Sequence, residues 1–454
     1  MKLPDTTDTI TALATPPGAG ALAVIRISGP AAFSAAASFL SPVPRGHAAA
    51  RLLSIMDGGA LVDRAVVIFF RAPASYTGED TVEITCHGSP YIIRTILNLA
   101  VRNGARPAEP GEFTLRAFLN GKMDLAQAEA VGELIAAGSA AAHRAAITQA
   151  EGGLSAEVLG IRTILLGLLA EIEARLDDSY EEVPALEARA FARRAAAALK
   201  KTLSLASGFE AGRGIREGIK VVIAGAPNSG KSSLLNALLG YDRAMVSPRA
   251  GTTRDTLEAA LDIDGFSVLF TDTAGLNARA ASPLEREGIK RAEKAIALAD
   301  ILVLVKDASI GETPGDRLAE KETARLAVKG ARLVHVFNKT DLPIKSRRPG
   351  GALLVSAKTG KGLAGLKTAL VAEQKKVFRD GAQAVVTSAR HFSALSAAAA
   401  ELRSLDAAMK GTPPPLELAA EHLRGALGAL ASLLGETTPE EVLGRIFRDF
   451  CVGK

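Results

Sequence analysis

The spacing of hydrophobic and polar positions changes twice along the chain. Over residues 9–122, short apolar runs alternate with glycine and proline turns, and residues 91–101 have the i, i+3, i+4 spacing of an amphipathic helix. Three runs rich in aliphatic and β-branched residues predict strands: 21–27, 65–70 and 81–86. The pattern therefore predicts an α+β domain.

Two other stretches are rich in alanine and leucine and poor in proline, as long packed helices are. The first covers residues 125–215, where Pro184 is the one proline, and the second begins near residue 378 and is interrupted at 411–415. Because the same texture lies on both sides of a different middle part, we expect a middle domain inserted into one all-α domain. Two separate helical domains would show the same periodicity. The predicted domains are residues 1–122, residues 123–217 together with 378–454, and residues 218–377.

The middle part begins with an apolar strand, residues 220–224, and a helix, residues 234–239, joined by a loop of the form G-x-x-x-x-G-K-S. Gly225 and Gly230 let the backbone turn its N–H groups toward a polyphosphate, and Lys231 brings a positive charge to the outer phosphates. The Ser232 hydroxyl can ligate Mg²⁺. This is a P-loop in its usual context, so we predict an α/β nucleotide-binding domain.

Composition and charge exclude some classes of protein. The 454 residues hold 54 Lys and Arg against 49 Asp and Glu, too small an excess to predict nucleic-acid binding by itself. The most apolar run, residues 161–169, is shorter than the ~18 residues a membrane span needs, and Arg162 interrupts it. We interpret this run as a core helix and expect no membrane partner. Two distant cysteines and an N-terminus without signal-peptide features indicate the cytoplasm.

Further motifs follow the P-loop in the order of a nucleotide switch. In residues 250–255, Thr253 provides a second hydroxyl for Mg²⁺ on a loop that a γ-phosphate could order. A strand, residues 266–270, leads to Asp272-Thr-Ala-Gly275, where Asp272 would hold Mg²⁺ through water and the Gly275 N–H would reach the γ-phosphate.

The base-recognition motif selects guanine. Asn338-Lys-Thr-Asp341 follows the strand at residues 333–337, and the Asp341 carboxylate can accept hydrogen bonds from N1–H and the 2-amino group, a pair of donors that adenine lacks. Ser356-Ala-Lys358, again after an apolar strand, can donate backbone N–H groups to the guanine O6. The predicted GTP-binding residues are Asn228, Ser229, Gly230, Lys231, Ser232, Ser233, Ser247, Pro248, Arg249, Ala250, Gly251, Thr252, Thr253, Asp272, Thr273, Ala274, Gly275, Asn338, Lys339, Asp341, Ser356, Ala357 and Lys358.

One position bears on hydrolysis. Many small GTPases have a glutamine after the Asp-x-x-Gly motif to orient the attacking water, but here the residue is Leu276, which has no polar atom. Another group must position the water. Glu285 is the first candidate and Glu287 the second, and either could instead be a solvated helix carboxylate.

A dense cluster of charge closes the first domain. Glu112, Arg116, Lys122 and Asp124 lie among aromatic residues in the stretch 110–125. Such density is typical of an anionic-ligand site or of a domain junction held together by ion pairs. Composition alone favours the ion pairs.

With these residues in place, the whole chain resembles the bacterial tRNA modification GTPases of the MnmE (TrmE) family. Flanking motifs more specific than the P-loop carry the resemblance: Ala14-Thr-Pro-Pro-Gly18, Val24-Ile-Arg-Ile-Ser-Gly29, Ser75-Tyr-Thr-Gly-Glu-Asp80, residues 110–125 and Phe450-Cys-Val-Gly-Lys454. The chain departs from the family at His87-Gly88-Ser89, where relatives usually have His-Gly-Gly.

The resemblance implies an N-terminal domain similar to the folate-binding domain of glycine-cleavage T-proteins, a split helical domain and an inserted G domain. The N-terminal domains would form a homodimer and bind a one-carbon donor, 5,10-methylenetetrahydrofolate or formyl-tetrahydrofolate. The matching folate positions are Arg26, Glu83, Lys122 and Lys454, which moves our interpretation of the charged junction toward a ligand site.

The resemblance also implies activation by potassium. Asn228 would ligate K⁺ together with the loop positions Ser247, Arg249 and Thr252, and the cation would stabilise transition-state charge in place of an arginine finger. Across a transient pair of G domains, Glu285 would then orient the water.

The implied reaction adds an aminomethyl or carboxymethylaminomethyl group to C5 of the wobble uridine of tRNA. The family carries it out with a flavin-dependent partner of the glucose-inhibited division protein A type, as a heterotetramer. Cys451 is a candidate participant because it lies in the terminal motif, and a buried structural thiol is an equal alternative.

A different class of function competes with this one, a regulatory switch GTPase that acts in ribosome assembly without modifying tRNA. Such relatives often carry an RNA-binding KH domain with a G-x-x-G loop after the G domain. Here alanine-rich helices and residues 451–454 occupy that place, so we rank this alternative second.

Overall fold

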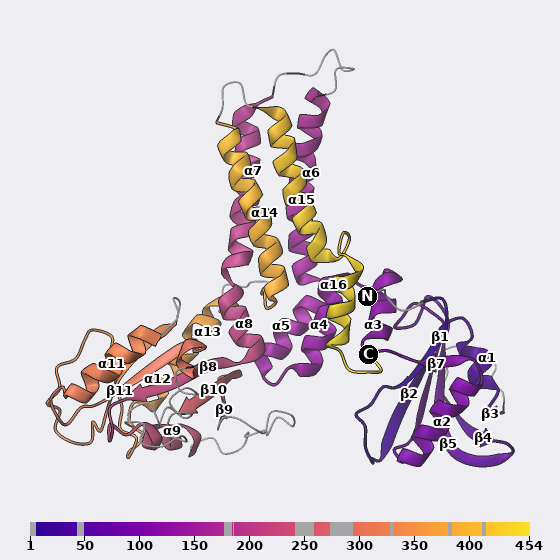
Figure 1. The fold of residues 1–454 in the computed structure, drawn as a ribbon, viewed down its shortest axis with the longest axis horizontal. Coiled ribbons are helices and arrows are strands. Elements are labelled where there is room, and N and C mark those ends of the chain that lie inside the picture. The colour runs from indigo at the N-terminus through magenta and orange to yellow at the C-terminus, as the bar shows by residue number, and fades with distance from the viewer. Residues whose placement is uncertain are drawn as a thin grey trace. The chain divides into compact units, whose positions relative to one another are not determined.

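The computed structural model divides into two compact units, each built from distant parts of the sequence (Figure 1). Unit 1 comprises Met1–Gly132, Gln149–Ala195 and Ala400–Lys454, and unit 2 comprises Glu133–Thr148 and Ala196–Ala399. The residues that the structure describes are 6–42, 50–176, 184, 186–240, 258–272, 294–326, 331–379, 384–410 and 415–454.

A seven-stranded sheet forms the N-terminal part of unit 1. Its strand order is β3-β4-β5-β6-β2-β1-β7, and all neighbours are antiparallel except β1 and β7. The strands are β1 (Thr9–Leu13), β2 (Leu22–Ser28), β3 (Leu40–Ser41), β4 (Arg51–Asp57), β5 (Ala60–Phe70), β6 (Thr81–His87) and β7 (Ala105–Pro107). The three predicted strands are confirmed as β2, β5 and β6.

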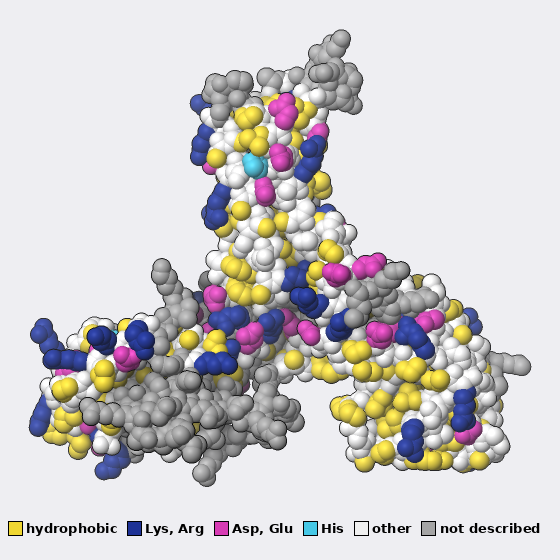
Figure 2. Space-filling model, in the orientation of Figure 1, with side chains coloured by type: hydrophobic (Ala, Val, Ile, Leu, Met, Phe, Trp, Pro, Cys, Tyr) yellow, Lys and Arg dark blue, Asp and Glu magenta, His cyan; other side chains and the backbone are white. Residues whose placement is uncertain are grey.

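Two helices, α1 (Ala32–Ala37) and α2 (Pro90–Arg102), cover one face of this sheet. The predicted helix at residues 91–101 is confirmed as α2, whose Ile93 and Ile96 pack into the same core as Ile25 of β2. Residues that alternate with the core along the strands project from the opposite face. There the cross-strand pair Leu52 and Val66 is 66% and 40% exposed, and apolar side chains gather on the surface of this domain (Figure 2).

The rest of unit 1 is helical. Helix α6 packs along α15, and the two lie side by side in Figure 1. Its buried residues include Ile161, Leu165 and Leu168, so the prediction of a core helix at residues 161–169 is confirmed. By length and hydropathy, α6 is also the one helix among the described residues that could cross a membrane. The main helices here are α3 (Glu112–Leu119), α4 (Leu125–Ala136), α6 (Gly153–Leu176), α15 (Leu416–Leu434) and α16 (Glu440–Arg448).

Unit 2 contains a six-stranded sheet with the order β13-β12-β11-β8-β10-β9. All neighbours are parallel except β9 and β10, as in a doubly wound α/β domain with one antiparallel edge. The strands are β8 (Ile219–Gly225), β9 (Glu258–Ile263), β10 (Phe266–Asp272), β11 (Ile301–Asp307), β12 (Arg332–Asn338) and β13 (Leu353–Leu354). The strands predicted before the P-loop, Asp272 and Asn338 are confirmed as β8, β10 and β12.

Helix α5 (Ala140–Ala150) lies in the alanine-rich stretch, yet its first half packs against this sheet. Ala141 and Ala145 share a hydrophobic core with Val221 and Phe266, and the Ala141 N–H donates to the Gly265 carbonyl over 2.9 Å. Small alanine side chains allow this close approach. The other helices of unit 2 include α8 (Phe209–Glu217), α9 (Lys231–Gly240), α11 (Pro314–Leu326), α12 (Leu363–Leu370) and α13 (Ala372–Arg379), while α7 (Ala188–Ser207) and α14 (Ala389–Ala408) contribute to both units.

Candidate functional site

The P-loop connects the carboxyl end of β8 to the first turn of α9, and its two glycines are required by close packing. A Cβ on Gly225 would lie 2.2 Å from the Val305 carbonyl oxygen, and one on Gly230 would lie 2.3 Å from Nδ2 of Asn338. Gly230 also has a φ of +92°, which L side chains rarely adopt. The loop therefore folds tightly against both β11 and β12.

The charged and polar groups of the loop converge on its inner side. Lys231 Nζ donates to the carbonyl oxygens of Gly225 and Ala226, each over 3.0 Å, so its ammonium group lies inside the loop. Asn228 has a φ of +62°, a left-handed conformation that asparagine tolerates better than most residues. Backbone amides turned toward one point at a helix N-terminus make a binding site for phosphate.

Asn338 connects three loops through one side chain. It is 2% exposed, its Nδ2 donates to the Ser229 carbonyl over 3.2 Å, and its Oδ1 accepts from the Ala357 N–H over 3.0 Å. The structure thus brings the P-loop, residues 338–341 and residues 356–358 together. The predicted phosphate-binding and base-binding residues of these segments lie around one site.

Asp341 is oriented for base recognition by a neighbouring hydroxyl. Ser356 donates to Asp341 Oδ1 over 2.6 Å, and this hydrogen bond lowers the pKa of Asp341 below its ordinary value. The carboxylate is therefore ionised at neutral pH. Its remaining acceptor positions can receive the two N–H donors of guanine.

An ion pair that no sequence pattern indicated supports this motif. Lys339 Nζ contacts Asp307 Oδ2 over 2.6 Å, and Ser309 donates to the other carboxylate oxygen. Burial opposes ionisation of Asp307, but the bonds from Lys339 and Ser309 hold its pKa below the ordinary value. Asp307 ends β11, so the available signal was an acidic residue directly after an apolar strand.

Part of the predicted GTP site lies outside the described residues, namely Ser247 to Thr253, Thr273 to Gly275, and Glu285. The backbone of Asp272 ends β10 and pairs in parallel with Ile223 of β8, close to the start of the P-loop. Ser232 lies in the first turn of α9. Within the described residues, no group of three or more His, Cys, Asp or Glu side chains forms a metal cluster.

Among the predicted folate residues of unit 1, Arg26 lies against two aromatic rings. Arg26 and Glu83 face each other on β2 and β6, and the Nε and Nη2 of Arg26 donate to Glu83 Oε1 over 2.9 and 2.7 Å. The Arg26 guanidinium lies 5.2 Å from the centre of the Tyr76 ring and 5.5 Å from that of Phe113. Arg26 Nη1 is buried and has no hydrogen-bond partner in the described structure.

The C-terminal tail is docked on the main chain of residues 110–113. Val452 forms a β-bridge with Pro110, and the Phe113 N–H donates to the Lys454 carbonyl over 3.2 Å. Lys122 lies on the loop after α3, where its Nζ donates to the Pro73 carbonyl. The tail thus brings Lys454 next to Phe113, whose ring contacts Arg26, while Lys122 contacts the segment that carries Tyr76.

No sequence pattern assigned a ligand role to Tyr76 or Phe113. The Tyr76 hydroxyl is hydrogen-bonded to Thr114 over 2.9 Å, and burial raises the pKa of Tyr76, so the ring stays neutral at physiological pH. Tyr76 belongs to the motif at residues 75–80 and Phe113 to the stretch 110–125. The only sequence feature that pointed to these two residues was an aromatic side chain within each family motif.

The charged junction is held by ion pairs around Arg116. This side chain is fully buried and donates to Asp8 Oδ1 over 2.6 Å and to Glu112 Oε1 over 3.0 Å. Burial opposes ionisation of Glu112, but hydrogen bonds from Arg106, the Glu109 N–H and Arg116 lower its pKa below the ordinary value. The expectation of a ligand site is therefore corrected for Arg116 and Glu112. Their charged groups are bound to each other and to other side chains of the protein.

Asp124 and Cys451 also have defined environments. Asp124 accepts from the Gln127 N–H over 2.9 Å, and Gln127 Oε1 accepts from the Asp124 N–H, so the pair caps α4. Cys451 is exposed, and the alternative of a buried structural thiol is wrong. Cys86 is the buried cysteine, and burial and nearby Asp63 raise the pKa of its thiol to about 11.

Two family models match the chain. The model described as "GTP-binding protein TrmE N-terminus" covers residues 9–122, and the "MnmE helical domain" covers residues 125–451. Among solved structures, the G domain of the FeoB iron transporter of T. maritima is 24% identical and covers 35% of this chain and 98% of its own, with a TM-score of 0.25. That score is too low to support an argument, so the sequence relatives carry the assignment.

Curated relatives match over the whole chain. A tRNA modification GTPase MnmE of Thermus thermophilus is 42% identical over 452 residues, which are 98% of this chain and 99% of the relative. Its counterparts in Azoarcus sp. and Christiangramia forsetii are 41% and 39% identical and cover 100% of this chain. With the P-loop and the guanine-recognition residues in one site, these relationships show that the chain belongs to the MnmE family of tRNA modification GTPases.

Proposed function

We propose that this GTPase, together with a flavin-dependent partner, uses a tetrahydrofolate one-carbon unit to add an aminomethyl or carboxymethylaminomethyl group to C5 of the tRNA wobble uridine. The observation that carries the proposal is full-length identity of about 40% to tRNA modification GTPases. The aromatic rings beside Arg26 support a folate site, and the guanine-recognition loops support the GTP site.

The GTPase part of the proposal assigns roles around the P-loop. Asp341 selects guanine, Lys231 neutralises the outer phosphates, and Glu285 orients the attacking water. Ser232 fits a magnesium ligand because its hydroxyl lies in the first turn after the loop. The remaining proposed GTP-binding residues are those of the P-loop, 247–253, 272–275, 338–341 and 356–358.

Two cations complete the proposed GTP site. Mg²⁺, held by Ser232 and Thr253 and through water by Asp272, would polarise the β- and γ-phosphates. K⁺, held by Asn228 with the loop positions Ser247, Arg249 and Thr252, would supply positive charge near the phosphates. The left-handed backbone of Asn228 is compatible with a specialised role in the loop.

The folate part of the proposal uses Arg26, Glu83, Lys122 and Lys454. A buried guanidinium nitrogen without a partner is unfavourable unless a ligand acceptor meets it, and Arg26 Nη1 is such a nitrogen. Tyr76 and the neighbouring Phe113 ring offer flat apolar surfaces for the ring system of a folate. The one-carbon unit of the cofactor would be the source of the added carbon, and the exposed Cys451 is a candidate participant.

The proposed assembly has several partners. A homodimer of N-terminal domains is supported by the apolar sheet face that carries Leu52 and Val66. A flavin-dependent protein of the glucose-inhibited division protein A type would complete a heterotetramer, and tRNA is the substrate, all in the cytoplasm. We also propose the split helical domain, because the helical family model begins and ends on either side of the unit 2 sheet.

The wobble nucleosides of cells that lack this chain test the reaction. Mass analysis should show loss of the C5-modified uridines, and the wild-type gene should restore them. Wild-type levels of modified uridine in the deleted strain would reject the proposal. A ribosome-assembly switch would instead change the ratio of subunits to ribosomes and leave the nucleosides intact.

Folate binding is tested by titration of the purified protein with formyl-tetrahydrofolate. Lys122→Ala should weaken binding about tenfold, as expected for loss of one charged contact, and leave guanine-nucleotide affinity unchanged. Lys345→Ala, a lysine of unit 2, is the matched control. An unaltered folate isotherm for Lys122→Ala would remove this residue from the site.

Potassium activation is tested by the rate of GTP hydrolysis in two salts. The rate should be higher in K⁺ than in Na⁺ at equal ionic strength, and Asn228→Ala should abolish the difference. Equal rates in the two salts would exclude the proposed K⁺ site.

A further inference from the structure

The chain reaches the sheet of unit 2 through α8 and leaves it through α13 and residues 384–388, which lead into α14. Helix α8 contacts both the outgoing segment and the start of α14. The rings of Phe209 and Phe392 stack with centroids 4.6 Å apart and planes 14° apart. Further along α8, a Cβ on Gly212 would lie 2.1 Å from the Val386 carbonyl oxygen, so only glycine permits this approach.

A third element, α4, contacts both segments. Glu133 of α4 accepts from Arg216 of α8 over 3.3 Å and from the Thr387 hydroxyl, which lies 3.0 Å from each carboxylate oxygen. The Glu133 side chain is 12% exposed and Thr387 is 1% exposed. The Glu133 carboxylate thus binds both connecting segments, through Arg216 on α8 and through Thr387 before α14.

Packing around this carboxylate is tight but not complete. A cavity of about 20 Å³, close to the size of one water molecule, is lined by Glu133, Arg216, Thr387 and four alanines between positions 136 and 145. Burial raises the pKa of Glu133 above its ordinary value, although Arg216, Thr387 and the buried His391 favour the charged form. Apolar groups at this place would stabilise the fold as well, so stability alone does not account for a carboxylate here.

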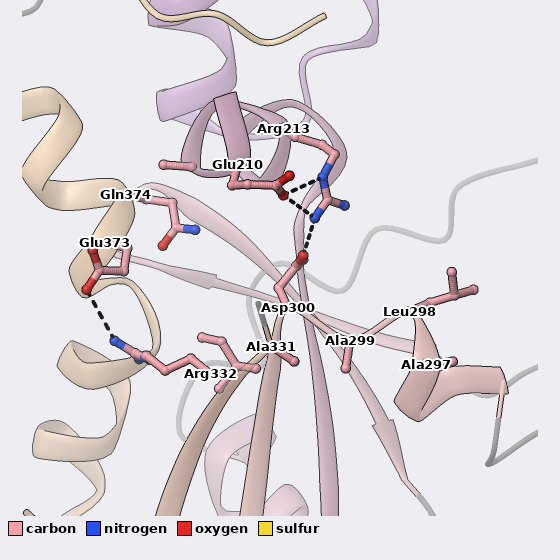
Figure 3. Close-up of a pocket in the computed structure, with 12 residues that line it drawn as sticks. Glu210, Arg213, Ala297, Leu298, Ala299, Asp300, Ala331, Arg332, Glu373 and Gln374 are labelled. Atoms are coloured by element: carbon pink, nitrogen blue, oxygen red, sulfur yellow. Dashed lines mark hydrogen bonds and ion pairs between the residues drawn. The ribbon is translucent and has the colours of Figure 1, made fainter. Parts of the chain in front are cut away.

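On its other side, α8 is fixed to the sheet by an ion pair beside an open cavity (Figure 3). Arg213 donates to Asp300 over 2.6 Å, and the other Asp300 oxygen accepts from the Lys220 N–H. A cavity of about 420 Å³ lies between α8, α13 and the amino ends of β11 and β12. Gln374 of α13 lines it, and its Oε1 is buried without a hydrogen-bond partner in the described structure.

The two sides of α8 therefore differ in what they contact. On the cavity side, α8 contacts α13 where Gly214 meets Gln374, and the cavity of about 420 Å³ opens beside that contact. On the opposite side, the Glu133 carboxylate ties α8 to the outgoing segment at Thr387. A change in the sheet that moves one segment must therefore either break these hydrogen bonds or move Glu133 with it.

We propose that Glu133 is a positioning residue that holds the two connecting segments in register and couples GTP hydrolysis in unit 2 to tRNA modification. The inference rests on the proposed function and adds the residue through which its two activities communicate. Helix α4 is then the element that moves with the two segments, because it carries Glu133, which accepts hydrogen bonds from both.

The test compares full-length variants in a strain that lacks the chromosomal copy. Glu133→Gln removes the charge and keeps one acceptor, and Thr387→Val removes the hydroxyl at nearly constant volume. For both, kcat and KM for GTP should stay within about twofold of wild type, while the modified fraction of tRNA should fall about fivefold or more, the lower range of allosteric coupling. Ile215→Val, at a buried α8 position whose side chain makes no hydrogen bond to the carboxylate, is the packing control and should retain modification.

Two further measurements separate coupling from simple loss of structure. The double variant Glu133→Gln, Thr387→Val should modify tRNA no worse than the more affected single variant, because both changes remove the same link. Amide hydrogen exchange should become faster at residues 384–388 and unchanged in β8 and β11.

The outcomes are distinct. Normal modification by Glu133→Gln would overturn the inference, and so would a parallel fall of GTP hydrolysis and modification, which indicates general damage. Additive losses in the double variant would also overturn it. If the wild-type gene itself restores no modified uridine, the proposed function fails, whereas restoration by wild type with failure by Glu133→Gln supports both.

Discussion

At the scale of single residues, several side chains serve as connectors between loops. Asn338 belongs to a base-recognition motif, yet its amide is fully used in holding the P-loop to residues 356–358. Asp341 keeps acceptor positions free and is oriented by Ser356. Within one short motif, therefore, one residue shapes the site and another reads the base.

Substitution of Asp341 should change the preferred base from guanine to xanthine. In Asp341→Asn, the amide presents a donor where the carboxylate had an acceptor, which suits the additional carbonyl of xanthine and not the amino group of guanine. We expect kcat/KM for GTP to fall on the order of 100-fold or more and that for xanthosine triphosphate to rise. Asp316→Asn, which alters a carboxylate at the start of α11, is the control and should keep GTP preference. Retained GTP use by Asp341→Asn would refute the assignment.

The buried ion pairs of unit 1 make a prediction about acid stability. The pKa of Glu112 is lower in the folded chain than its ordinary value, so the ionised group stabilises the fold above the unfolded pKa of about 4.3. That contribution is lost as the pH falls through the folded pKa. The difference in free energy of unfolding between wild type and Glu112→Gln should therefore be largest near pH 7 and shrink below pH ~4, measured by urea denaturation.

An exposed carboxylate provides the comparison for this experiment. Glu109→Gln, at an exposed position, should change the free energy of unfolding at pH 7 less than Glu112→Gln does. A difference for Glu112→Gln that stays constant down to pH ~3 would show that its charge does not stabilise the fold.

Arg116 shows why part of unit 1 could not be predicted from sequence. An arginine in a stretch dense with charge is normally exposed, but this one is fully buried. Two of its partners, Asp8 and Glu79, are 108 and 37 residues away in sequence. Local composition correctly favoured ion pairs at this junction, whereas identifying the partners requires the fold.

At the scale of elements, the strands that end in functional motifs were predictable because they are short and mostly apolar. β8 and β12 are of this kind: β8 lies in the middle of the mostly parallel sheet, and β12 lies next to its edge strand β13. The packing of α5 was not predictable, since alanine-rich helices carry little information about which surface they cover. The Asp307–Lys339 ion pair likewise depends on strand order.

The closeness of the P-loop to β12 can be tested at Gly230. In Gly230→Ala, the new Cβ meets Asn338 Nδ2 at 2.3 Å, and the residue also has a φ of +92°. The left-handed conformation alone costs roughly 1–2 kcal/mol, and the contact forces the loop away from Asn338. GTP affinity should fall by at least tenfold in a fluorescence titration.

Gly240→Ala, at the far end of the helix that follows the P-loop, is the matched control, because no described residue lies within 4 Å of a Cβ at Gly240. It should bind GTP as wild type does. Equal affinity of Gly230→Ala and wild type would contradict the tight contact between the P-loop and Asn338.

At the scale of the whole molecule, segments distant in sequence complete each site. In unit 2, Glu133 and Thr387 meet although 254 residues separate them. In unit 1, the C-terminal tail bridges to Pro110 through main-chain contacts, and this docking brings Lys454 beside Phe113. The resemblance of terminal motifs to the family indicated that both ends matter, but the physical contact between them was visible only in the fold.

Removing the tail should abolish folate binding without affecting GTP hydrolysis. Deletion of residues 451–454 removes the bridge to Pro110 and the Lys454 carbonyl that Phe113 contacts. Formyl-tetrahydrofolate binding should become undetectable by calorimetry, while GTP hydrolysis by unit 2 should persist. Gly453→Ala is a milder variant whose Cβ would lie 2.2 Å from the Leu13 carbonyl oxygen. Unchanged folate binding after the deletion would show that the tail is not part of the site.

The docked tail also has a consequence for synthesis on the ribosome. Pro110 and Phe113 are translated more than 300 residues before Val452 and Lys454. At roughly 5–20 residues per second, tens of seconds pass between the synthesis of this part of the N-terminal domain and that of the tail that docks on it. Throughout that interval the Leu13 and Pro110 edge is uncovered, so stalled or prematurely terminated chains would expose an open backbone edge to chaperones and proteases.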